Sequence, residues 1–152
     1  SPAGCSEPVW KTFADLGLLG LAVPVEHGGF GGGATDLMTV MDAIGEALVV
    51  EPYLATVVGA RIVARAGDEA ARARILPAVA EGRLRLALAY LEAGARYDPS
   101  RVTTAARREA GGFVLDGAKP AVLHAPVAGL VVVSAMLDGR VALFLASDLS
   151  AK

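Results

Sequence analysis

Histidine and cysteine, the side chains that most often ligate metals or act as nucleophiles, are rare in this chain. They occur only as His27, His124 and Cys5. Metal sites built from such residues need closely spaced ligand pairs, and these three positions offer none. We therefore expect neither a metal centre nor an internal disulfide, and we interpret His27 as a loop residue.

A glycine-rich segment is the next candidate for chemistry, because backbone amides in such loops can cradle phosphate. Its members are Gly28, Gly29, Gly31, Gly32 and Gly33. Nucleotide-binding versions place Gly-x-Gly-x-x-Gly after a strand or close with Gly-Lys-Ser, and neither context is present. We expect a tight loop between helices.

Two tyrosines, an arginine and the second histidine complete the candidate binding residues. Arg96 has the fork geometry to pair with a phosphate, or it is a surface arginine beside Asp98. Tyr90 and Tyr97 fit either a ligand wall or ordinary packing. His124 is a ligand contact or a loop residue.

Composition narrows the class of protein. The chain has 152 residues, a formal net charge of −2 and a mean hydropathy of +0.51. This balance gives no field that favours nucleic acid. The longest uncharged run, residues 120–137, contains two prolines and a glycine, so it predicts broken strands rather than a membrane span. No signal peptide is recognisable, and we expect a cytoplasmic protein.

The spacing of apolar residues predicts helices over the first half. A first helix begins near Ser6 and Pro8 and ends at Gly17, and a second is capped by Thr35 and Asp36. The apolar face expected for the second helix consists of Leu37, Val40, Met41, Ile44 and Leu48.

Two further helices are expected before residue 84. The third begins at Pro52 and ends at Gly67; the fourth is capped by Asp68, runs toward Pro77, and Gly82 ends the helical half. The residues of the third helix that we expect to face inward are Leu54, Val57, Val58 and Ile62.

From residue 84 the hydrophobic period shortens to that of strands. The expected strands cover residues 84–91, 102–107, 113–115, 130–136 and 141–146. Asp138-Gly139 is a strong type I′ hairpin signal between the last two strands. We predict an α+β fold with an all-α bundle over residues 1–83 and antiparallel β structure over 84–152. The valine-rich sheet needs further cover, so we expect it to be incomplete.

Four segments, in this order and spacing, resemble the acyl-CoA dehydrogenase family. They are LGLLGLAVPVEHGGFGGG (16–33), ILPAVAEG (75–82), TTAAR (103–107) and GGFVLDGAK (111–119). The resemblance implies an N-terminal helical domain over 1–83 and part of a middle β-barrel over 84–152. A C-terminal helical bundle, also typical of the family, would lie outside these residues.

The resemblance also implies a reaction. In the family a glutamate of the C-terminal bundle removes an α-proton from an acyl-CoA thioester while a β-hydride passes to FAD. We therefore expect no catalytic residue in this chain. An acceptor of the electron-transfer flavoprotein type is one option, and the sequence does not identify the acceptor. Family members form homo- or hetero-oligomers, and flavoprotein oxidases and monooxygenases of the same architecture are an alternative.

The two flavin-facing loops depart from the family pattern. Where relatives have Thr-Glu-Pro-x-x-Gly-Ser-Asp, this chain has Leu-Glu-Ala-Gly-Ala-Arg-Tyr-Asp at 91–98, and Leu123 stands near the position of a flavin-contacting threonine. By position, the resemblance assigns Tyr90, Leu91, Tyr97, Leu123 and His124 to the flavin site and Arg96 to the substrate. Lost hydroxyls at a buried flavin edge cost roughly 1–3 kcal/mol each.

Two hypotheses follow from this departure. The first is an acyl-CoA dehydrogenase with an unusual flavin pocket. The second is a structural subunit of a heteromeric enzyme, which mainly completes the active site of its partner, with FAD held jointly. The replacements at Leu91, Arg96, Tyr97 and Leu123 favour the second hypothesis.

Overall fold

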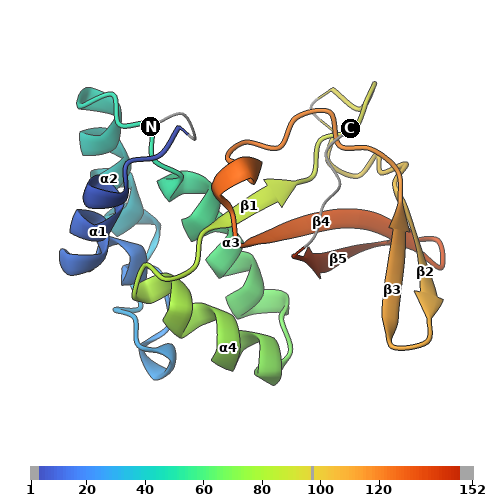
Figure 1. The fold of residues 1–152 in the computed structure, drawn as a ribbon, viewed down its shortest axis with the longest axis horizontal. Coiled ribbons are helices and arrows are strands. Elements are labelled where there is room, and N and C mark those ends of the chain that lie inside the picture. The colour runs from blue at the N-terminus through green and yellow to red at the C-terminus, as the bar shows by residue number, and fades with distance from the viewer. Residues whose placement is uncertain (1–3, 97, 148–152) are drawn as a thin grey trace.

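The computed structural model describes residues 4–96 and 98–147, and it divides into a helical half and a sheet (Figure 1). The helices are α1 (Glu7–Asp15), α2 (Ala34–Glu46), α3 (Tyr53–Ala66) and α4 (Glu69–Ala80). The strands are β1 (Leu86–Ala89), β2 (Ala105–Glu109), β3 (Gly112–Asp116), β4 (Leu130–Leu137) and β5 (Arg140–Ala146). The α+β class and the change of period near residue 84 are confirmed.

Local capping signals set two of the helix starts, though not both as expected. Asp68 Oδ1 accepts a hydrogen bond from Ala71 N at 2.7 Å, as predicted for α4. The N-cap of helix α2 is Gly33, two residues before the predicted cap Thr35. The prediction of Thr35 as a cap was therefore wrong, whereas Asp36 does help to cap the helix: its carboxylate lies inside the first turn and accepts from Gly33 N at 2.7 Å.

The buried face of α3 matches the prediction at Val57, which is buried, and differs from it at Leu54. Leu54 is 55% exposed, whereas Thr56 is fully buried and its hydroxyl contacts the backbone N and O of Leu86 at 3.2 and 3.4 Å. A Cβ at Gly59 would lie 3.0 Å from Leu86 Cβ. Strand β1 thus packs on the small and polar side of α3, which a purely hydrophobic pattern places outside.

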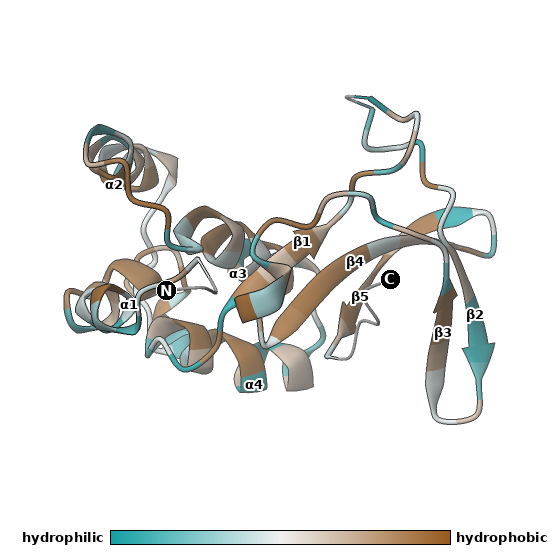
Figure 2. Cartoon of the chain, turned by 45° about the horizontal axis from the view of Figure 1, so that its top comes forward, coloured by the Kyte–Doolittle hydropathy of each residue, from teal (hydrophilic) through white to brown (hydrophobic). Residues whose placement is uncertain are grey.

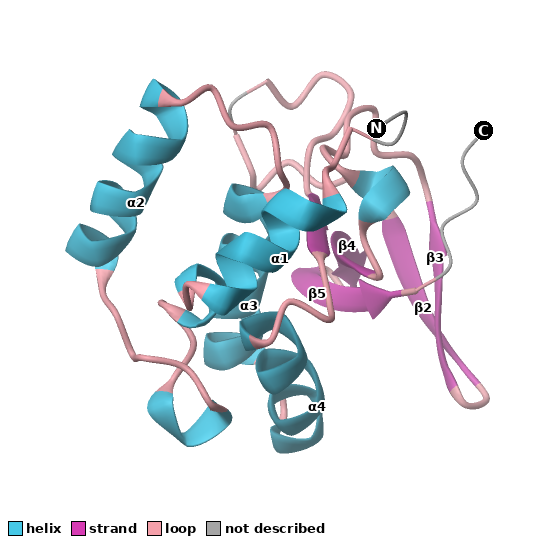
Figure 3. Ribbon diagram, turned by 60° about the vertical axis from the view of Figure 1, so that its left-hand side comes forward, coloured by secondary structure: helices cyan, strands magenta, loops and turns pink. Residues whose placement is uncertain are grey.

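Helix α2 stands apart from the other helices (Figure 3). None of its residues is buried, although Leu37, Val40, Met41 and Ile44 pack against the cluster around Trp10. The predicted face was wrong at Leu48, which follows the helix and is 84% exposed. This helix contributes little to the core.

The sheet is mixed, so the expectation of purely antiparallel β structure was wrong. Strands β1 and β4 are parallel, pairing Leu86 with Leu130, while β4–β5 and β2–β3 are antiparallel. The chain leaves β1, forms the β2–β3 hairpin and returns along β4 in the original direction (Figure 1). The hairpin at Asp138 and Gly139 is confirmed, with φ of 49° and 75°.

The main core joins both halves of the chain. Its buried members come from the segment before α2, from α3 and α4, and from β1 and β4: Val23, Ala60, Val63, Ile75, Leu76, Val79, Leu86 and Leu130. The hydropathy colours agree with this core (Figure 2). Strand β4, which contributes to the core, is apolar, whereas part of β2, which contributes no residue to it, is hydrophilic. The division into domains at residue 83 stays a prediction.

One side of the edge strand β5 remains uncovered. Val141, Leu143 and Leu145 are 46%, 48% and 37% exposed, and they alternate with half-buried residues. Across residues 4–96 and 98–147, every helix is too short or too polar to cross a membrane.

Candidate functional site

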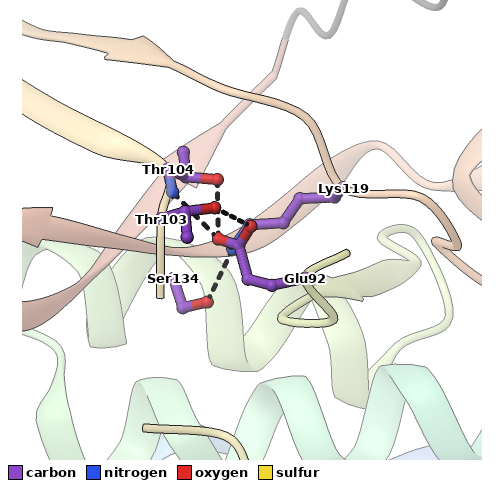
Figure 4. Close-up of polar contacts among 5 residues, drawn as sticks. All are labelled: Glu92, Thr103, Thr104, Lys119 and Ser134. Carbon is purple, nitrogen blue, oxygen red and sulfur yellow. Dashed lines mark hydrogen bonds and ion pairs between the residues drawn. The ribbon is translucent and has the colours of Figure 1, made fainter. Parts of the chain in front are cut away.

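A polar cluster, buried except at Thr103, lies where four segments meet at one end of the sheet (Figure 4). Glu92 follows β1, Thr103 and Thr104 precede β2, Lys119 follows β3, and Ser134 lies in β4. We call these five residues the Glu92 cluster. The side chains of Glu92 and Lys119 are only 2% and 7% exposed.

Both oxygens of the Glu92 carboxylate accept hydrogen bonds. Glu92 Oε1 accepts from Lys119 Nζ at 2.7 Å, from Thr104 Oγ1 at 2.8 Å and from Thr104 N at 3.0 Å. Glu92 Oε2 accepts from Thr103 Oγ1 at 2.6 Å. Lys119 Nζ also donates to Ser134 Oγ at 3.0 Å. A buried ion pair is tolerated when further hydrogen bonds satisfy its charged groups, and here both carboxylate oxygens and the ammonium have partners besides each other.

The electrostatics give Glu92 a holding role rather than a proton-transfer role. Burial raises the pKa of Glu92, but hydrogen bonds from Lys119, Thr103 and Thr104 outweigh burial and lower the pKa to about 2. A general base works best with a pKa near the operating pH. Glu92 is therefore ionised at neutral pH and acts as an acceptor that fixes its neighbours.

The cluster lies at the base of two loops. The first loop, residues 90–104, connects β1 to β2, and the second loop, residues 117–129, connects β3 to β4. In the first loop Asp98 Oδ1 accepts from Ser100 N at 3.0 Å and from Ser100 Oγ at 2.6 Å, which lowers the pKa of Asp98. Gly94 and Arg96 have φ of 77° and 52°.

The sequence-predicted site residues lie on these two loops. Tyr90 is 50% exposed, Leu91 is half-buried and Arg96 is exposed. In the second loop Leu123 is 75% exposed, and His124 is half-buried at the start of the short 3-10 helix Ala125–Val127, with φ of 62°. Tyr97 lies outside the described residues.

The structure joins the loops through residues that the site prediction omitted. Glu92 adjoins Leu91, and Lys119 lies four residues before Leu123, so the ion pair links the two predicted segments. Among residues 4–96 and 98–147, no hydrogen bond joins Tyr90, Arg96 or His124 to one another. Lys119 was recognisable as a lone charge that begins a long uncharged run, but only the fold identifies its partner.

The described hydroxyls of this region take part in hydrogen bonds within the protein. Thr103 and Thr104 donate to Glu92, Ser100 donates to Asp98, and Ser134 accepts from Lys119. Backbone amides of the first loop, including those of Ala95, Asp98, Arg101 and Val102, bond within the loop. Leu91 and Leu123 add no donor. These residues are occupied with holding the loops.

The glycine-rich segment is the tight loop that was predicted. Its amides bond to the preceding chain: Phe30 N to Gly20 O at 3.0 Å, Gly31 N to Val23 O at 2.9 Å and Gly32 N to Leu21 O at 2.7 Å. A Cβ at Gly29 would lie 2.1 Å from Val23 O, so glycine is required there. His27 lies in the short 3-10 helix Val25–His27 beside this loop.

The described part of the chain also has a cavity and a groove. An open cavity of about 1710 Å³ lies between the α3–α4 helices and the sheet, where Asp68, Leu115 and Val131 contribute to its walls. A groove of about 470 Å³ separates α2 from α3 and is lined by Met38, Ile62 and neighbours. Over the described part of the chain, no group of three or more His, Cys, Asp or Glu residues is arranged to hold a metal ion.

Comparison with known proteins identifies the lineage of this fold. The description "Acyl-CoA dehydrogenase, N-terminal domain" matches residues 3–83, which is more than half of the chain. The chain belongs to the acyl-CoA dehydrogenase family. "Acyl-CoA dehydrogenase FadE12" of Mycobacterium tuberculosis is 33% identical over 114 residues, which cover 73% of this chain and 29% of that protein.

Solved structures of the acyl-CoA dehydrogenase family show the same arrangement. A variant of the "Tcur3481-Tcur3483 steroid ACAD" is 31% identical, with a TM-score of 0.89 over 97% of this chain and 40% of that one. The ChsE4-ChsE5 complex from Mycobacterium tuberculosis is 29% identical, with a TM-score of 0.83 over 94% of this chain and 38% of that one. The chain thus spans less than half the length of these relatives.

Proposed function

We propose that this chain is a subunit of a flavin-dependent acyl-CoA dehydrogenase in which its own contacts to FAD are weakened. The observation that carries the proposal is the state of the two loops: Leu91 and Leu123 stand where hydroxyl donors are expected, while the Glu92 cluster beneath them is complete. The scaffold of a flavin site is present without its polar surface.

FAD supplies the hydride-accepting chemistry of such an enzyme when it is bound. The described residues do not fit a complete flavin site, so we assign no reaction step to a flavin held by them alone. We propose that a second chain supplies the missing contacts, with Tyr90, Leu91, Leu123 and His124 lining one wall of the joint site. Arg96, exposed on the first loop, is proposed to face the acyl-CoA substrate.

Two of the similar solved structures support a heteromeric assembly. Each of these structures has two named components, Tcur3481-Tcur3483 and ChsE4-ChsE5. The uncovered face of β5, with Val141, Leu143 and Leu145 exposed, is consistent with further packing against other protein. We propose a cytoplasmic oligomer that passes electrons to an acceptor of the electron-transfer flavoprotein type.

Flavin content tests the proposal. The full chain as encoded is purified alone and together with a family member encoded beside it, and visible flavin absorbance is measured per mole of each chain. We expect little flavin on the chain alone and stoichiometric flavin on the complex. Tight one-to-one FAD binding by the chain alone would contradict the weakened site.

A matched pair of variants sharpens the test. Leu123→Thr restores a hydroxyl at the position that the resemblance assigns to the flavin, whereas Leu123→Val keeps the branched shape without the hydroxyl. We expect the threonine variant to retain more flavin than the valine variant. Equal retention would show that this position does not contact the cofactor.

A further inference from the structure

We propose that Glu92 and Lys119 are positioning residues that make the first and second loops move as one unit. The inference rests on the proposed function only for the role of the loops, because the coupling itself requires no flavin. Lys119 Nζ lies 2.7 Å from Glu92 Oε1, and both side chains are almost fully buried. This ion pair spans the two loops directly.

Glu92 closes the first loop upon itself. The carboxylate lies near the start of that loop and accepts hydrogen bonds from Thr103 and Thr104 at its far end. The turn between them is further held by Asp98 and Ser100. Displacing the Glu92 carboxylate therefore releases both ends of the loop at once.

Lys119 ties the second loop to that carboxylate and to the sheet. Its ammonium donates to Ser134 Oγ in β4 as well as to Glu92. Two residues earlier, Gly117 has φ of 152°, and a Cβ there would lie 2.8 Å from Thr104 Cα. The bases of the two loops are thus in direct contact through backbone as well as through charge.

Strand β4 is the common anchor for both loops. Ser134 holds Lys119, and Met136 N donates to Thr104 O at 2.8 Å. Beyond the base, no hydrogen bond joins the polar tip residues Tyr90, Arg96 and His124 to one another in the described part of the chain. The relative position of the loop tips is therefore set by the contacts at the bases of the loops.

Crosswise perturbation tests the coupling. Thr103→Val removes a contact of the first loop, and Ser134→Ala removes a contact of Lys119. Hydrogen–deuterium exchange is followed in the full chain as encoded. We expect Thr103→Val to speed exchange in the second loop, and Ser134→Ala to speed exchange in the first loop, each by roughly three- to tenfold.

Ser100→Ala is the matched control. Ser100 Oγ lies 2.6 Å from Asp98 Oδ1, the same distance as Thr103 Oγ1 from Glu92 Oε2, and both bonds lie in the first loop. Only the Thr103 bond reaches the Glu92 cluster. Exchange after Ser100→Ala should rise in the first loop alone.

Three outcomes would overturn the proposal. Thr103→Val could behave like Ser100→Ala and leave the second loop unchanged; exchange could rise equally in α3 and α4, which indicates global destabilisation; or no peptide could change. Flavin content is measured on the same samples. Its absence would count against the proposed function and leave the exchange result intact.

Discussion

The two loops differ sharply between their base and their tips. At the base, the ion pair of Glu92 and Lys119 is buried, and each charged group has a further hydrogen-bond partner. At the tips, Leu123 and Tyr90 are 75% and 50% exposed, and Arg96 is exposed as well. The difference shows that the buried contacts that hold the two loops can be intact while the exposed residues at the loop tips depart from the family pattern.

Removing Lys119 should have the largest effect on stability. Lys119→Met leaves the Glu92 carboxylate buried without its ion partner, and we expect a loss of about 3–5 kcal/mol in the free energy of unfolding. Lys11→Met is the matched control, because Lys11 Nζ also lies 2.7 Å from a carboxylate, that of Asp15, but with side chains 74% and 62% exposed. The control should lose less than about 0.5 kcal/mol.

Urea unfolding of the full chain as encoded measures both variants. If Lys119→Met and Lys11→Met lower the free energy of unfolding by the same amount, the buried ion pair stabilises the chain no more than the exposed one does.

Acid should act on the base of the loops next. The pKa of Glu92 lies at about 2, below its ordinary value of 4.5, because hydrogen bonds outweigh burial. The unfolded state therefore binds the proton more tightly, so this stabilisation is complete above pH 4.5 and is lost as pH falls through about 2. Linkage places the loss at no more than about 3 kcal/mol.

Glu92→Gln identifies this contribution in a pH series of unfolding curves. The variant is less stable than the parent chain at neutral pH, and the gap between the two should narrow as the pH is lowered. A constant gap down to about pH 2 would show that Glu92 titrates normally.

A backbone substitution tests the contact between the loop bases. Gly117→Ala adds a Cβ 2.8 Å from Thr104 Cα at a φ of 152°, and we expect a loss of about 1–3 kcal/mol. Gly94→Ala is the control, since Gly94 also has a positive φ of 77° but nothing lies within 4 Å of its added Cβ. Thermal unfolding should show Gly117→Ala as the more destabilised variant; the reverse order would contradict the close contact.

The smallest effect on stability is expected at the tips. Leu123→Ser removes a side chain that is 75% exposed, so the free energy of unfolding should change by less than about 0.5 kcal/mol. Differential scanning calorimetry measures this change. A loss above about 1 kcal/mol would mean that Leu123 is covered by other protein.

Much of the fold was predictable because its signals are local. The period change near residue 84, the Asp68 cap and the Asp138-Gly139 hairpin each depend on residues a few positions apart. The resemblance likewise drew attention to both loops through short motifs. Such signals act through the geometry of one helix or one turn, so the order of residues is enough to identify them.

The remaining features depend on contacts between distant segments. The parallel pairing of β1 with β4 requires a return across about forty residues of chain, and the hydrophobic period of a strand carries no direction. The buried side of α3 was decided by the fit of Gly59 and Thr56 against Leu86. Both outcomes are properties of packing.

The sequence by itself determined the α+β class, the family and the positions of two loops in which Leu91 and Leu123 replace the hydroxyl-bearing residues of the family pattern. Only the tertiary structure decided that Glu92 and Lys119, 27 residues apart, share a buried ion pair at the base of those loops. The physical reason is that a charge can be buried only where the fold supplies its partners. Those partners come from separate segments, which the fold alone brings within 3 Å.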